Sequence, residues 1–169
     1  MCLITEQKEP FTADKDIPVW KLVGQFHNYF MNCLYYGSCI NYRVGETYTT
    51  KMEKSNSNPL AADEASWNRY FGTGISLVGF TKIRKGFHSC NSLERVIMFD
   101  KGHIRDGLPV YLECIIPKGG LYYQDDTGLL VSDKITVVAA WCTETGRKIK
   151  TNKHGNPIKV FKRAAQTSS

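Results

Sequence analysis

The chain contains 169 residues, which suits one domain with a hydrophobic core, and its 42% hydrophobic and 22% charged residues are ordinary for a globular protein. No stretch is long and apolar enough for a membrane helix, and residues 1–16 lack the apolar core of a signal peptide. The composition therefore excludes a membrane helix, and we expect a cytoplasmic protein with no membrane partner.

The net charge of +6 is concentrated at the C-terminal end. From Thr143 onward one acidic residue, Glu144, faces seven basic ones: Arg147, Lys148, Lys150, Lys153, Lys159, Lys162 and Arg163. Subtracting these from the totals of 22 basic and 16 acidic residues leaves 15 of each before Thr143. We therefore expect a single globular α+β domain over 1–142 and a basic C-terminal extension over 143–169, in which 158–161 could add an edge strand. Such an extension could bind nucleic acid non-specifically through its phosphates.

The first half of the chain mixes one clear strand with segments that are harder to assign. Residues 1–16 form a polar lead-in, and "IPVWKLVG" (17–24) predicts a strand. The aromatic run at 25–36 could be a helix ended by Gly37 or a loop that places aromatic rings on the core. Residues 41–50 predict a bent strand or a hairpin, and 51–74 predict a surface loop because Ser, Asn and Pro interrupt its first part.

The second half has a stronger pattern. A strand at 75–83 leads to a helix at 91–99, where Asn91 and Glu94 have the spacing of a capping box. "LPVYLECIIPKG" (108–119) predicts a strand and a turn, and further strands flank the "DDTG" turn. The last strand, "KITVVAAWC" (134–142), is almost entirely apolar and should lie inside a sheet. These elements predict an α+β fold, mostly β, with one or two helices.

The six cysteines predict neither a disulfide framework nor a metal site. They are scattered, no CxxC pair occurs, and no histidine lies near the closest pair, Cys33 and Cys39. In a reducing compartment they should be free thiols. The chain also lacks a P-loop and a GxGxxG motif, so we expect no cofactor and no metal.

Three segments occur in an order that resembles the ADP-ribosyltransferase-like fold: "GFHSCNSLERV" (86–96), "VYLECIIPKGGLYY" (110–123) and "LLVSDKITVV" (129–138). The chain also resembles uncharacterised phage and Bacteroidetes proteins of similar layout. The resemblance implies a split sheet around a cleft that holds a nucleotide-like or ADP-ribose-derived molecule. A phage protein of this kind would act in the host cytosol, as an anti-defence protein that sequesters a host immune signal.

The departures from that family's pattern concern its catalytic groups. Lys21 stands where the family has an Arg or His, and Ser132 and Asp133 stand near the position of the catalytic glutamate. Aspartate is one methylene shorter, and a catalytic carboxylate must come within hydrogen-bond reach of its target. The resemblance therefore implies binding without transferase chemistry. The alternative is a diverged ADP-ribosyltransferase or NAD glycohydrolase that uses Asp133 or Glu113.

The candidate ligand-binding residues are polar or aromatic side chains on or next to these segments: Lys21, Tyr42, Arg43, His88, Ser89, Ser92, Lys118, Tyr122, Tyr123 and Ser132. Each has a structural alternative. His88 could contact a ligand or bond to the backbone at a strand end, and the serines could bind a phosphate or cap the helix, a role we assign to Asn91. The tyrosines could stack a base or pack in the core. We expect Phe87 in the core and His88 and Ser89 on the cleft, and exposed sheet edges could pair in a homo-oligomer.

Overall fold

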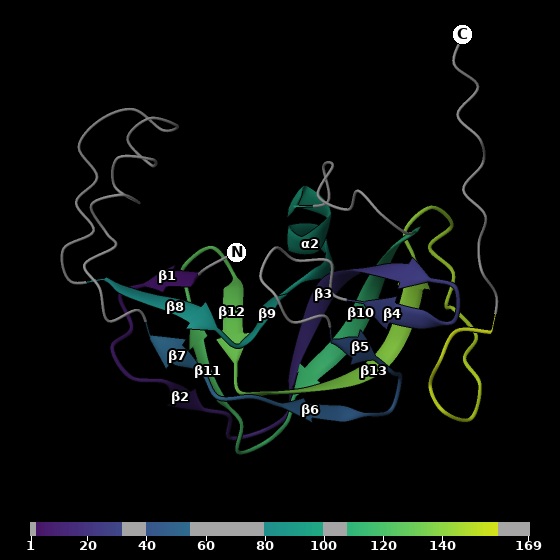
Figure 1. Ribbon diagram of the computed structural model, residues 1–169. Coiled ribbons are helices and arrows are strands. Elements are labelled where there is room, and N and C mark those ends of the chain that lie inside the picture. Colours follow the sequence, from purple (N-terminus) through teal and green to yellow (C-terminus); the bar gives the residue numbers. More distant parts are fainter. Residues whose placement is uncertain (1–2, 32–39, 55–79, 100–107, 159–169) are drawn as a thin grey trace, which may run out of the picture.

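The computed structural model describes residues 3–31, 40–54, 80–99 and 108–158, which form a mostly β protein with one short helix (Figure 1). The elements are, in chain order, β1 (Leu3–Thr5), β2 (Phe11–Thr12), β3 (Ile17–Phe26), β4 (Tyr29–Met31), β5 (Asn41–Tyr42), β6 (Thr47–Thr49), β7 (Glu53–Lys54), β8 (Thr81–Lys85), β9 (Phe87–Cys90), α2 (Leu93–Phe99), β10 (Leu108–Ile116), β11 (Leu121–Gln124), β12 (Leu129–Ser132) and β13 (Lys134–Cys142).

The strands form a small and a large sheet, and every pairing among the described residues is antiparallel. The small sheet has the order β1-β8-β7. The large, ten-stranded sheet has the order β2-β11-β12-β9-β3-β10-β13-β6, and β4 and β5 attach to it through β3. The mostly β prediction is therefore confirmed.

The centre of the large sheet is the ladder of β3, β10 and β13. Strand β3 pairs with β10 over nine residue pairs, from Gln25↔Leu108 to Ile17↔Ile116. Strand β13 pairs with the other edge of β10, and Val138 is an extra residue there, because Glu113 pairs with Ala139 and Cys114 with Val137. At this bulge Val138 is 43% exposed, whereas the other residues of β13 are buried or half-buried.

The two faces of this ladder bury different sets of side chains. Val19 and Val23 of β3 face the main hydrophobic core, while Trp20 and Leu22 face a second cluster that contains Val96 of α2. Alternation along a strand accounts for this division, because successive side chains point to opposite faces. Both faces of β3 are therefore covered, which explains its apolar sequence.

Strand β9 lies between β12 and β3, but it pairs with them very unequally (Figure 1). All four of its residues pair with β12, whereas a single pair, Trp20↔Cys90, joins it to β3. An antiparallel ladder continued from that pair would next join Lys21 to Ser89, and the structure has no such pair. At the boundary between β9 and β3, the large sheet is therefore joined by only one residue pair.

A glycine makes the corner between the two sheets possible. Gly86 separates β8 of the small sheet from β9 of the large one, and its φ is +146°. A Cβ at this position would lie 2.3 Å from Cγ1 of Val131, so a side chain would require Val131 to shift.

Several predicted boundaries differ from the structure. The strand at 17–24 extends to Phe26, and a turn at His27 leads into β4, so the helix alternative for 25–36 is wrong over 25–31, while 32–36 lies outside the described residues. The 41–50 region forms two short strands that pair with different partners, β4 and β13, rather than a hairpin. Most of the predicted loop at 51–74 and of the strand at 75–83 lies outside the described residues.

The segment after Cys142 is packed against the rest of the protein. Ile149 is only 4% exposed and belongs to the main core, and its N–H bonds to the carbonyl of Ala140. Further along, the carbonyl of Gly155 accepts the N–H of Val44, and a Cβ on Gly155 would lie 2.2 Å from the Val44 oxygen. The core therefore includes residues beyond the domain boundary expected after Cys142. Of the predicted edge strand at 158–161, only Ile158 is described.

Two further expectations concern membranes and cysteines. Among the described residues, no helix has the length and apolar character needed to cross a membrane. The three described cysteines, Cys90, Cys114 and Cys142, are buried free thiols.

Candidate functional site

A buried lysine lies inside the main core. The Lys21 side chain is 3% exposed, on the face of β3 that also carries Val19 and Val23. Its Nζ donates a hydrogen bond to the carbonyl of His88 and lies 5.8 Å from the ring centroid of Tyr42. Three predicted ligand-binding residues are thus brought together.

Burial determines the electrostatics of this region. It lowers the pKa of Lys21 to about 8, although the Cys114 thiol partly opposes the shift. Burial also raises the pKa of the Cys114 thiol to about 12 and raises that of the Tyr42 phenol. For His88, burial and then the Lys21 charge lower the pKa of the ring to about 3. The thiol, phenol and imidazole are therefore neutral at pH 7, whereas Lys21 is still mostly protonated there and loses its proton around pH 8.

Two buried hydroxyls next to Lys21 have no hydrogen-bond partner among the described residues. They are the phenol of Tyr42, which is fully buried, and Oγ of Ser89, a residue that is 4% exposed. An unpaired buried polar group costs about 1–3 kcal/mol, so most proteins avoid it. We call Lys21, Tyr42, Ser89 and Cys114 the interior cluster.

The side chains of His88 and Ser89 point to opposite faces of β9, so they do not line the same site. Phe87 is buried in the main core, as expected, and Ser89 shares its face of β9. The His88 side chain points to the other face, opposite Val131 in the ladder, and contributes only its carbonyl to the interior cluster. The alternation that separates Phe87 from His88 separates His88 from Ser89 as well.

The serine before α2 has a structural role. Oγ of Ser92 accepts the N–H of Arg95 at 3.2 Å, which makes Ser92 the N-cap of α2. The expected cap, Asn91, lies one residue too early, and its N–H bonds instead to the carbonyl of Gly128. The expected capping box is therefore wrong, because the third helical residue is Arg95 and not Glu94.

The other predicted ligand residues are dispersed. Arg43 is exposed and pairs with Glu46 at 3.4 Å, and Lys118 is exposed on a turn. Tyr122 pairs with Ser132 across β11 and β12 and contacts the ring of Phe11. Ser132 is fully buried, and its hydroxyl donates to the carbonyl of Lys134.

The two candidate catalytic carboxylates already have structural partners. Glu113 accepts the indole N–H of Trp141 at 3.0 Å and pairs with Trp20, so it lies on the face of β10 opposite to Lys21. Oδ1 of Asp133 accepts the N–H of Leu121 at 2.8 Å. The two carboxylates are therefore not arranged around the interior cluster.

Two surface pockets of about 330 Å³ differ sharply in charge. The first, which we call the lysine pocket, is lined by Glu9, Pro10, Thr50, Lys51, Met52, Lys54, Leu121, Tyr123 and Asp133. The second, the acidic pocket, is lined by Ile4, Thr5, Glu6, Gln7, Phe11, Phe80, Gln124, Asp125 and Asp126. Sequence reasoning found Tyr123 and Asp133 of the lysine pocket. It missed Lys51 and Lys54, because their segment gave only the signal of a polar surface loop.

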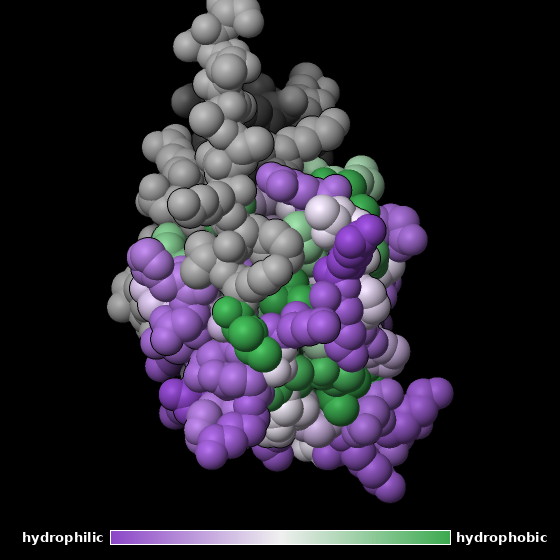
Figure 2. All heavy atoms as spheres, turned by 90° about the vertical axis from the view of Figure 1, so that its right-hand side faces the viewer, coloured by the Kyte–Doolittle hydropathy of each residue, from purple (hydrophilic) through white to green (hydrophobic). Residues whose placement is uncertain are grey.

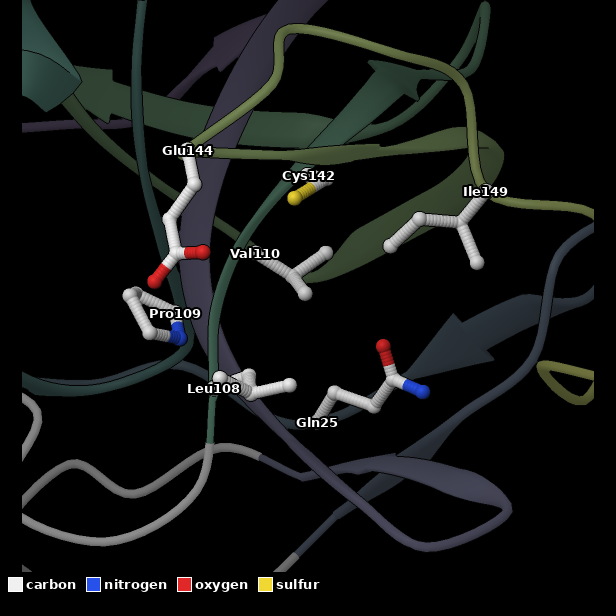
Figure 3. A pocket seen from close by; sticks show the side chains of 7 residues that line it. All are labelled: Gln25, Leu108, Pro109, Val110, Cys142, Glu144 and Ile149. Atoms are coloured by element: carbon white, nitrogen blue, oxygen red, sulfur yellow. The ribbon is translucent and has the colours of Figure 1, made fainter. Parts of the chain in front are cut away.

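A third pocket lies at the far end of the main core (Figure 3). The side chains of Gln25, Val110 and Ile149 project into it, and Glu144 lies at its side (Figure 3). Its volume of about 10 Å³ is close to the minimum for one water molecule, which excludes a larger ligand.

No group of three or more His, Cys, Asp or Glu side chains within the described ranges is placed to hold a metal ion. Comparison of the chain with protein-family models, with characterised proteins and with solved structures gives no match.

Proposed function

We propose that this chain is a binding protein for a small nucleotide-like molecule, which is held in the lysine pocket. The carrying observation is that this pocket combines apolar side chains with two lysines, while its two carboxylates already have partners: Glu9 pairs with Lys54 and Asp133 accepts the N–H of Leu121. A volume of about 330 Å³ lies at the lower end of the range of about 300–1,000 Å³ for small-molecule sites. Met52 and Leu121 are half-buried and offer apolar surface for a base, and the lysines offer charge for a phosphate.

The charges of the lysine pocket favour an anion at Lys51. The ammonium of Lys54 already bonds to Oε1 of Glu9 at 3.0 Å and lies 5.8 Å from the Tyr123 ring centroid. Lys51 is exposed and forms no salt bridge with the described residues. Its ammonium is therefore available to a ligand, whereas Glu6, Asp125 and Asp126 of the acidic pocket would repel a phosphate.

Binding without catalysis fits the carboxylates. Glu113 and Asp133 both accept hydrogen bonds that stabilise strands, and Glu113 is remote from the lysine pocket in the sheet order. If the chain is instead a diverged ADP-ribosyltransferase or NAD glycohydrolase, Asp133 is the carboxylate that lines the pocket. NAD turnover by the purified protein that disappears in Asp133→Asn would establish that alternative.

The finer proposal is a cytoplasmic phage protein with an ADP-ribosyltransferase-like fold that sequesters a host immune signal. Its support is the order of the segments at 86–96, 110–123 and 129–138. Strands β2 and β6 end the large sheet and could pair with a second copy of the chain in a homo-oligomer.

A ligand panel tests the proposal. NAD, ADP-ribose, AMP and cyclic dinucleotides are added to the full chain, and the midpoint of thermal unfolding is measured. We expect at least one of them to raise the midpoint, and Lys51→Ala to weaken its binding about tenfold or more. The matched control is Asp126→Ala in the acidic pocket, which should leave the affinity unchanged. No response to any compound, or equal effects of the two substitutions, would overturn the proposal.

A second candidate function is non-specific binding of nucleic acid. Arg147, Lys148, Lys150 and Lys153 are all exposed, on a segment that Ile149 anchors to the core. Figure 2 views the side on which this segment lies, and hydrophilic side chains cover much of the described part of that face. If this function is present, affinity for single-stranded DNA falls steeply with salt, and Lys148→Glu with Lys150→Glu removes it. Affinity that does not change with salt would contradict it.

A further inference from the structure

The amine of Lys21 lies at the boundary between β3 and β9, where a single residue pair joins the two strands. The ladder between these strands ends after the pair Trp20↔Cys90, so it leaves the neighbouring main-chain groups without cross-strand partners. Nζ of Lys21 donates to the carbonyl of His88 there. A lysine side chain thus supplies a hydrogen bond at the place where the β-ladder stops.

This amine has unused bonding capacity. An ammonium carries three donors, and the His88 carbonyl is the one hydrogen-bond acceptor that the described residues give it. None of the salt bridges among these residues involves Lys21. Burying a cation without a counter-charge costs several kcal/mol, which favours the neutral amine.

The neutral form has a free electron pair and is a nucleophile. With the pKa near 8, about 10% of Lys21 is neutral at pH 7, against about 0.04% of a lysine with the ordinary pKa. The Cys114 thiol does not compete, because its raised pKa keeps it protonated. The amine is therefore the reactive group of the interior cluster.

The two unpartnered hydroxyls belong to residues near the Lys21 amine: Tyr42, whose ring centroid lies 5.8 Å from Nζ, and Ser89, which follows the His88 carbonyl that Nζ binds. Tyr42 and Ser89 are buried on the side of the main core that Lys21 faces, and each has a donor to offer. A carbonyl oxygen next to Nζ would accept from such donors, and the negative charge that develops on it during amine attack strengthens those hydrogen bonds.

We propose that Lys21 is a carbonyl-reactive lysine that captures a small aldehyde as a reversible imine. The Nζ electron pair attacks the aldehyde carbon, and the C=O π electrons move to the oxygen. That oxygen takes up a proton and Nζ loses one, which gives a carbinolamine. Loss of the hydroxyl with a second proton from nitrogen releases one water and leaves a C=N bond between the ligand and Nζ.

The packing limits the size of this aldehyde. None of the three pockets described above is lined by Lys21, and its side chain is only 3% exposed. An aldehyde can therefore reach the amine only if two strands separate locally. Separation of β3 from β9 would break the fewest main-chain hydrogen bonds, because these strands share a single residue pair. The ligand is accordingly an aldehyde of few heavy atoms, and it is distinct from the nucleotide-like molecule of the lysine pocket.

The test is reductive trapping on the full chain. The protein is incubated with propanal and cyanoborohydride at pH 7, and the alkylated lysines are located by peptide mass mapping over time. We expect Lys21 to be labelled at least tenfold faster than Lys54. The rate should rise between pH 7 and pH 8, and Tyr42→Phe should slow it about fivefold or more.

Two variants serve as controls. Lys21→Met removes the amine and should abolish the fast adduct, whereas Lys15→Met removes an exposed amine that lines none of the pockets described above and should leave that adduct unchanged. Labelling confined to exposed lysines, or an unchanged fast adduct in Lys21→Met, would overturn the proposal. If Lys21→Met fails to fold, the mapped positions in the unsubstituted chain decide the question.

Discussion

The ammonium of Lys21 and the main-chain carbonyl of His88 are joined by a hydrogen bond across two strands that pair at one position only. The bond has opposing effects on stability. It satisfies a carbonyl that the ladder leaves unpaired, but it requires a lysine to be buried without a carboxylate. The balance between these effects depends on pH, because deprotonation removes the charge while the amine can still donate.

Substitution of Lys21 by Met should change how stability depends on pH. The pKa of Lys21 is about 8 in the folded state and 10.5 as a model value, so between these values the unfolded chain binds more protons and stability rises with pH. Relative to Lys21→Met, the unsubstituted protein should gain about 1 kcal/mol between pH 8 and pH 9, measured by urea unfolding. The buried groups Cys114 and Tyr42 destabilise the fold at higher pH, but they are common to both proteins. A stability difference that stays constant over this range would contradict the prediction.

His88 should destabilise the fold in acid. Burial lowers the pKa of its ring from 6.5 to about 3, so the unfolded chain takes up a proton that the folded protein does not. Stability should therefore fall as the pH decreases from 6.5 towards 3, by about 2 kcal/mol between pH 6.5 and pH 4.5. His88→Gln should remove this contribution, and the exposed His154, substituted in the same way, provides the control. A His88 ring that titrates near pH 6.5 by NMR would show the prediction to be wrong.

The free energies of unfolding of Ser92 and Asn91 variants should show which of the two residues caps α2. Ser92→Ala removes the oxygen that accepts the N–H of Arg95 and should cost about 1 kcal/mol of unfolding free energy. The side chain of Asn91 is exposed, and Asn91→Ala should stay within about 0.5 kcal/mol of the unsubstituted protein. Denaturant titration of both variants checks this order, and a larger loss from Asn91→Ala would restore Asn91 as the cap.

Ile149 tests whether the segment after Cys142 contributes to the core. Its side chain is 4% exposed, so Ile149→Ala should lower the free energy of unfolding by about 2–5 kcal/mol. The matched control is Ile158→Ala, because Ile158 is 62% exposed and should cost less than about 0.5 kcal/mol. Equal, small effects of the two substitutions would mean that the segment does not stabilise the body.

The long strands could be predicted from the sequence because their apolar patterns are local. The runs at 17–24, 108–116 and 134–142 correspond to β3, β10 and β13, and the turn at 125–128 follows from its Asp and Gly. Asp125 illustrates this, since its carboxylate accepts the N–H groups of Thr127 and Leu129. The short strands β1 and β2 were not predicted, because a segment of two or three residues is too short to show an alternation of apolar and polar side chains.

Lys21, Tyr42 and Ser89 were candidate ligand residues, but their grouping in the interior cluster could not be predicted, since it depends on how strands far apart in the sequence are arranged. In "VWKLVG" a lysine between apolar residues suggests an exposed position, and nothing local indicates that α2 and the main core cover both faces of β3. Likewise, Glu113 was a candidate for catalysis until its pairing with Trp20 placed it on the opposite face. Lys51 and Lys54 line a pocket only because β11 and Asp133, which lies between β12 and β13, are close to them.

The pairing of β3 with β10 also determines when the protein can fold during synthesis. The first residue of β10, Leu108, pairs with Gln25, so the ribosome must complete about two thirds of the chain before the longest ladder can begin to form. Contacts this distant in sequence make folding slow, because a long loop must close before any of them stabilises the chain. During that interval most of the apolar β3 strand is unpaired, because its neighbour β4 covers only Gly24 to Phe26, and an exposed strand of this kind readily associates with other chains. Slower translation would lengthen this exposed period, and chaperones that bind extended apolar segments would shorten it.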